Sequence, residues 1–152
     1  ERRVAALWAS LDDTPEEEFL AAMDRLTGGD SAEELFERGA AQDSTGHSDS
    51  AVPLYREALA RGLSGIRRRR AVIQMASSLR NMGRGEESVA LLRAERDAGP
   101  DQLDDAVAAF LALALADTGR EREGLSLVLE ALAPHLPRYQ RSVGNYARNL
   151  VV

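Results

Sequence analysis

Side chains capable of catalysis or metal binding are present in this chain but isolated from one another. His47 and His135 each lack a second His, Asp or Glu at the spacing of zinc ligands, and cysteine is absent. No Ser, His or Asp lies in a nucleophile-elbow or comparable catalytic context. The glycines at 28–29 and 83–85 lack the further glycines and the lysine of a phosphate-binding loop. The sequence therefore predicts no enzyme activity, no metal site and no cofactor.

The strongest local charge is the run Arg67–Arg70. Four cations at the start of a helix oppose the helix dipole, so they need acidic partners. We expect some of them to pair with Glu33, Glu37 or Asp43 in the same chain. The alternative is that the run anchors an acidic ligand. The whole chain has a net charge of −6, which argues against non-specific binding to nucleic acid.

Helical elements are indicated along the whole chain. Residues 1–10 and 15–27 are expected to form two helices with apolar side chains at helical spacing, with Thr14 as the N-cap and Pro15 as the first helical residue of the second helix. Asp30-Ser31 is expected to cap the helix that follows. The last segment, 137–151, reads as an amphipathic helix that begins at Pro137. No apolar run approaches the roughly 20 residues that span a bilayer, so we expect no membrane association.

Three glycines divide the middle of the chain at a nearly constant interval. Gly46 and Gly83 are 37 residues apart, and Gly83 and Gly119 are 36 apart. Each ends one helix-like segment and precedes another after a short polar turn, which suits a left-handed C-terminal cap. Repetition at this period is typical of a helical repeat array.

Small residues accompany each glycine turn. They lie in the middle of the first helix (Gly39, Ala76, Ala112) and early in the second (Ala51, Ser88, Gly124), with a large residue four positions later (Tyr55, Leu92, Val128). Small residues let two antiparallel helices approach closely, and the large residue is expected to fill the space beyond. In these positions the chain resembles the tetratricopeptide repeat family from about Ser31 onward, and in particular its bacterial single-domain forms with slightly long, divergent repeats.

The resemblance implies an all-α fold, a right-handed superhelical array of antiparallel helix pairs. Residues 1–30 would form an N-terminal helical pair, 32–66, 69–100 and 105–136 three units, and 137–151 a capping helix. First helices in this family line a concave groove in which a partner lies. Transferring those positions gives the candidate binding residues Phe36, Arg70, Ile73, Gln74, Ser77, Arg80, Asn81, Phe110, Leu113, Arg141, Asn145 and Arg148. Arg141 and Asn145 resemble, without the lysine, a pair that clamps a peptide carboxylate in some members.

The predicted function is a non-enzymatic, cytoplasmic scaffold that binds a protein or peptide, including acidic ones. Two alternatives stay open. In the first, the chain is a homodimeric structural module, with Val4, Leu7, Trp8 and Leu11 as the self-association patch if they do not pack on Phe19 and Met23. In the second, it is the sensor or regulatory part of a larger protein.

Overall fold

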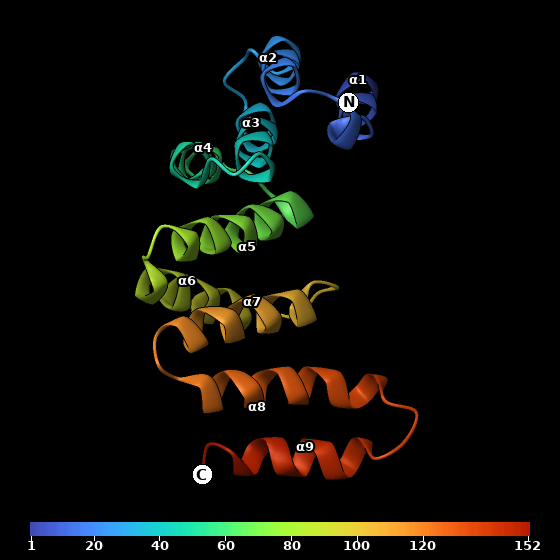
Figure 1. Cartoon of the computed structure of the whole chain (residues 1–152), viewed down its shortest axis with the longest axis vertical. Helices are drawn as coiled ribbons and strands as arrows, with labels where there is room; N and C mark the ends of the chain where they lie inside the picture. The colour runs from blue at the N-terminus through green and yellow to red at the C-terminus, as the bar shows by residue number, and fades with distance from the viewer. The chain divides into compact units, whose positions relative to one another are not determined.

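The computed structural model describes residues 1–152 and is all helical (Figure 1). It contains nine α-helices, two short 3₁₀ turns and no strand. The helices are α1 (Arg2–Trp8), α2 (Glu16–Leu26), α3 (Ala32–Ser44), α4 (Ser48–Ala60), α5 (Gly65–Asn81), α6 (Gly85–Asp97), α7 (Asp104–Asp117), α8 (Glu121–Leu132) and α9 (Gln140–Asn149), and the 3₁₀ turns are η1 (Leu11–Asp13) and η2 (Ala133–His135). This confirms the predicted all-α class. None of these helices is both long enough and apolar enough to cross a bilayer.

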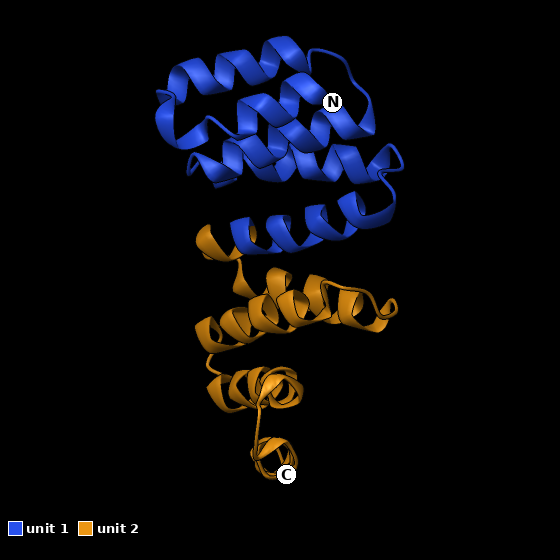
Figure 2. Ribbon diagram, turned by 90° about the vertical axis from the view of Figure 1, so that its right-hand side faces the viewer, with its two compact units in different colours: residues 1–78 blue, residues 79–152 orange.

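The helices divide into two compact units (Figure 2). Unit 1 comprises residues 1–78, from α1 to most of α5, and unit 2 comprises residues 79–152, from the last turn of α5 to α9. Within unit 1, α2 packs against α1 and α3, and α3 packs along α4. Within unit 2, α7 packs against α6 and α8, and α8 packs against α9.

The N-terminal helices bury their own apolar residues. Phe19 and Met23 of α2 are fully buried, and Val4, Leu7, Trp8 and Leu11 pack against them. The indole of Trp8 meets the Phe19 ring edge-on, with ring centroids 5.3 Å apart. The patch on which self-association was expected to depend is therefore occupied within the chain.

Helix starts follow the sequence signals in one case and depart from them in another. At α3, the Ser31 hydroxyl accepts from the Glu34 amide while the Glu34 carboxylate accepts from the Ser31 amide, so the expected cap is a complete capping box. At α2 the prediction was wrong by one residue. Pro15 is the N-cap with an extended backbone, and the Thr14 hydroxyl instead donates to the Ser10 carbonyl at 2.7 Å.

The three periodic glycines form the same turn. Gly46, Gly83 and Gly119 have φ of 87°, 75° and 77°, the left-handed region that glycine enters without strain. In each turn the amide of the following residue donates to a carbonyl five residues earlier, as in His47 to Gln42 at 2.8 Å. This 6→1 bond defines the Schellman motif, so the predicted C-terminal caps are confirmed.

Two predicted close approaches between helices are present. A Cβ on Gly39 would lie 3.0 Å from two ring carbons of the fully buried Tyr55, and a Cβ on Gly124 would lie 2.8 Å from the Ala112 carbonyl oxygen. Val128, expected to fill the space beyond the second contact, is instead 38% exposed. The Gly124–Ala112 contact is backbone to backbone, and Val128 lies one helical turn further along α8, directed toward solvent.

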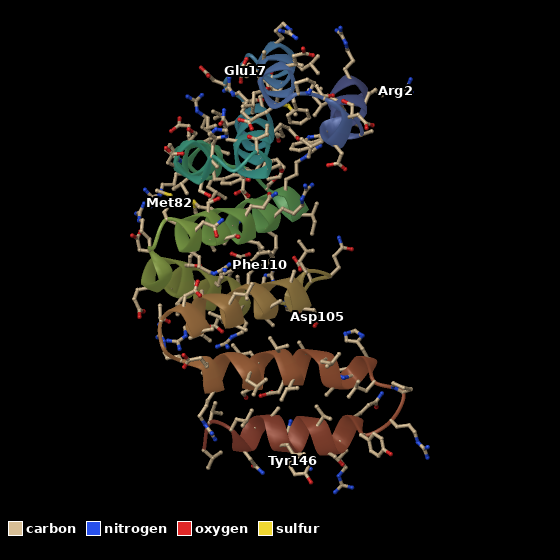
Figure 3. The ribbon with its side chains drawn as sticks, in the orientation of Figure 1. Arg2, Glu17, Met82, Asp105, Phe110 and Tyr146 are labelled. Atoms are coloured by element: carbon tan, nitrogen blue, oxygen red, sulfur yellow. The ribbon has the colours of Figure 1, made fainter.

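The last helix is shorter than predicted. It begins at Gln140, three residues after Pro137, because Tyr139 adopts a left-handed backbone with φ of 69° and interrupts the chain direction there. Gly144 and Ala147 are buried on the face that packs against α8. The opposite side of α9 carries Tyr146, which is largely exposed (Figure 3).

Candidate functional site

The apolar candidates of unit 1 are core residues. Phe36 on α3 is fully buried and Ile73 on α5 is almost so. The Phe36 ring packs against Tyr55, with centroids 6.2 Å apart, and the Arg70 guanidinium lies 5.2 Å from its centroid. The buried side chains of Phe36 and Ile73 stabilise the helix packing and offer almost no exposed contact area to a partner. Arg70 is exposed and remains available on its outer side.

Two arginines of the run have partners other than those expected. Arg67 pairs with the Glu1 carboxylate at 3.3 Å, and Arg70 stacks on Phe36. Glu37 accepts a hydrogen bond from the Trp8 indole at 2.7 Å. The acidic side chains of α3 thus accept hydrogen bonds mainly from neutral donors.

Asp43 is an acidic side chain of α3 that accepts hydrogen bonds from two neutral hydroxyl groups within unit 1. One of its carboxylate oxygens accepts from the Ser78 hydroxyl at 2.6 Å, and the other accepts from the Tyr55 hydroxyl at 3.5 Å. Burial raises the pKa of the Asp43 carboxyl above its usual range, and the two hydrogen bonds oppose that shift. Burial and the nearby Asp43 likewise raise the pKa of the Tyr55 phenol. This network joins α3, α4 and α5 and is structural in character.

The remaining unit 1 candidates, Gln74 and Ser77, lie half-buried on α5. The Gln74 Oε1 atom is buried and has no hydrogen-bond partner. Buried acceptors are normally satisfied, so this amide is an exception within the helix packing.

In unit 2 an apolar strip is exposed on α7. Ala109, Leu113 and Ala116 recur at intervals of four and three residues and are all exposed, Leu113 by 47%. We call these three residues the α7 face. Phe110, labelled in Figure 3, is half-buried beside them. Among the apolar candidate residues, Leu113 is therefore the one whose side chain is exposed.

The polar candidates of unit 2 differ in availability. Arg80 is held by an ion pair with Asp117, whereas Asn81 is exposed. On α9, Arg148 donates to the Asn145 side-chain oxygen at 2.6 Å. Arg141 and Arg148 together line a cavity of about 370 Å³ between η2 and α9, to which Glu130 also contributes. The structure thus brings Arg141, Asn145 and Arg148 into one basic cluster.

Two surfaces were not identified from the sequence. Leu125, Val128 and Leu132 are exposed on one side of α8, at intervals of three and four residues; we call them the α8 stripe. Their helical periodicity is visible in the sequence, and of the three only Val128 was expected to lie inside. The second surface is a cavity beside Trp8, formed by residues distant in sequence, for which no local signal exists.

The two histidines lie apart from these surfaces. His47 is near the Glu16 carboxylate at 3.4 Å, and His135 contacts Asp105 at 2.8 Å. The structure holds no group of three or more His, Cys, Asp and Glu side chains with the arrangement of a metal site.

Comparison with known proteins agrees with the repeated helix–glycine–helix geometry. A family model described as Tetratrico peptide repeat matches residues 32–150, which leaves out α1, η1, α2 and the chain ends. No curated protein and no solved structure gives a significant match to the chain. Because the family model matches most of its length and its three glycine turns are equivalent, the chain belongs to the tetratricopeptide repeat family.

Proposed function

We propose that this chain is a non-enzymatic binding protein that holds a segment of another protein on the α7 face and the basic cluster of α9. The observation that carries the proposal is the exposure of Leu113 between two alanines. A large apolar side chain flanked by small ones offers a shallow surface that a partner's apolar side chain can cover. Family membership supports the same class of function.

The chemistry of the partner follows from the charges of α9. Arg141 and Arg148 are exposed, and no acidic residue occurs in residues 137–152. Guanidinium groups pair with carboxylates in a bidentate geometry. The expected partner segment therefore combines an apolar side chain with one or more carboxylates.

The test compares two leucines that differ only in their helix. Peptides are selected by display on the intact chain, and their affinity is then measured for Leu113→Glu and Leu125→Glu. The two residues are equally suitable for substitution, since they are 47% and 50% exposed. We expect Leu113→Glu to weaken binding by about tenfold or more, the effect of losing a central contact, and Leu125→Glu to leave it unchanged. The reverse pattern would move the site to α8.

Charge reversal of α9 gives a second readout. Arg141→Glu is expected to weaken binding of the selected acidic peptides, with a smaller effect at high salt because exposed charges are then screened. Unchanged affinity would remove α9 from the site.

The α8 stripe favours one other function, self-association. Three exposed apolar side chains on one helix face are unusual for a monomer surface, although a stable dimer buries about 800 Å² per partner. Light scattering over the micromolar range tests this. A dimer that dissociates on Leu125→Glu would support it, and a monomer throughout would rule it out.

A further inference from the structure

A cavity of about 400 Å³ lies in unit 1 where α1, the end of α2, the start of α3 and the start of α5 come together. Its volume is within the range of pockets that hold small ligands, about 300–1,000 Å³. Val4, Trp8 and Leu26 supply apolar wall, and Glu33, Glu37 and Arg67 supply charge. The apolar residues Val4, Trp8 and Leu26 precede residue 32, where the family match begins. The cavity is therefore a feature of this chain's own N-terminal helices.

The charge of the cavity is strongly negative. Four glutamates (Glu1, Glu33, Glu34 and Glu37) line it, against the single cation Arg67. Glu34 is used by the Ser31 capping box, and Glu1 pairs with Arg67. Glu33 has no partner. Glu37 accepts from Trp8 through Oε2 alone.

The two carboxylates that remain lie one helical turn apart. Glu33 and Glu37 are four residues apart on α3, so their side chains lie on the same face of the helix. The Trp8 hydrogen bond fixes Glu37 at the indole edge, beside the apolar wall. A ligand that satisfies this arrangement needs an apolar stem and a planar cation with several donors. The cavity already accommodates one such group at its margin, the guanidinium of Arg67.

We propose that this cavity receives an arginine side chain from a partner protein. Its methylene groups lie against Val4, Trp8 and Leu26, and its guanidinium bonds Glu33 and Glu37. Arginine suits the site better than lysine because its fork presents donors to two carboxylates at once, whereas an ammonium is a compact, strongly hydrated charge. This site lies in unit 1 and is independent of the binding surface proposed for unit 2, so each can fail without the other.

The chain contains one tryptophan, and it lines the cavity. The Trp8 indole N–H therefore gives a single NMR signal that reports on the site. Isotope-labelled protein is titrated with N-acetyl-arginine N-methylamide and, separately, with the citrulline analogue, which has nearly the same shape without the charge. We expect a saturable shift of the indole signal with the arginine compound, at millimolar affinity for so small a ligand. We expect no saturable shift with citrulline.

Matched variants assign the binding to the two carboxylates. Glu33→Gln with Glu37→Gln keeps an acceptor for Trp8 and removes both charges, whereas Glu17→Gln with Glu18→Gln removes two charges from exposed positions of α2 outside this cavity. We expect about a tenfold loss of affinity in the first pair and less than twofold in the second. Equal affinity for arginine and citrulline, equal loss in both pairs, or no shift at all would overturn the proposal. Amide spectra of each variant verify that it is folded.

Discussion

Gly124 allows α8 to approach α7 more closely than a side chain would permit. A Cβ at this position would lie 2.8 Å from the Ala112 carbonyl oxygen and 3.3 Å from the Ala112 Cα. Both atoms belong to the backbone of α7, so no rotation of a side chain relieves the contact. Gly124→Ala should therefore force α8 away from α7 and lower the free energy of unfolding.

The magnitude follows from comparison with a second glycine. Gly144 is also buried within a helix of unit 2, but a Cβ there would first meet the flexible Arg148 guanidinium at 3.5 Å, an ordinary contact. Alanine is better than glycine in a helix by about 1 kcal/mol, and this gain applies to both substitutions. Overpacking costs about 1–3 kcal/mol and applies to Gly124→Ala alone. Gly124→Ala is thus expected to be less stable than Gly144→Ala by about 1–3 kcal/mol.

Urea denaturation followed by circular dichroism measures this difference. Because the two units need not unfold together, amide hydrogen exchange should also be followed, and the loss of protection should fall on α7 and α8. If Gly124→Ala proves as stable as Gly144→Ala, the close contact between α7 and α8 is not present in solution and the reasoning fails.

Three further predictions concern unit 1. Gly39→Leu places a branched side chain against the buried Tyr55 ring and should cost more than the about 1–3 kcal/mol of ordinary overpacking; an unchanged melting temperature would contradict the contact. The raised pKa of Asp43 means that the folded state keeps a proton that the unfolded state has lost, so stability should fall as pH rises from about 4 through the folded pKa. Asp43→Asn should flatten that dependence while still accepting from Ser78, and an unaltered pH profile by thermal melting would argue against this origin. Ser31→Ala removes half of the capping box and should destabilise the chain by about 1 kcal/mol in urea titrations, a value near zero being the contrary result.

Features set by local sequence could be predicted. The left-handed turns at Gly46, Gly83 and Gly119 depend on a few adjacent residues, and so does the Ser31 cap. Thr14 shows the limit even here. The hydroxyl that could have capped α2 instead bonds the Ser10 carbonyl, because η1 brings that carbonyl within reach.

Features set by packing could be predicted only in part, at the close approaches of Gly39 and Gly124. Periodicity places Phe36 on one face of α3, but it does not say that Tyr55 and Arg70 cover that face. The same pattern placed Val128 inside, but the side chain is 38% exposed. The hydrogen bond from Trp8 to Glu37 joins residues 29 apart in sequence, so only the tertiary structure reveals it and the cavity beside it.

The two proposed sites differ in the sign of their charge, and this difference has a consequence for specificity. An acidic segment that suits Arg141 and Arg148 would be repelled by Glu33 and Glu37, and an arginine-bearing segment would be repelled by α9. Each site therefore rejects the ligand of the other by charge. A partner that uses both must carry its acidic and basic residues in separate stretches, and a uniformly charged peptide can occupy one site alone. The N-acetyl-arginine compound should accordingly leave the binding of an acidic peptide unaffected, since it has no carboxylate to offer α9.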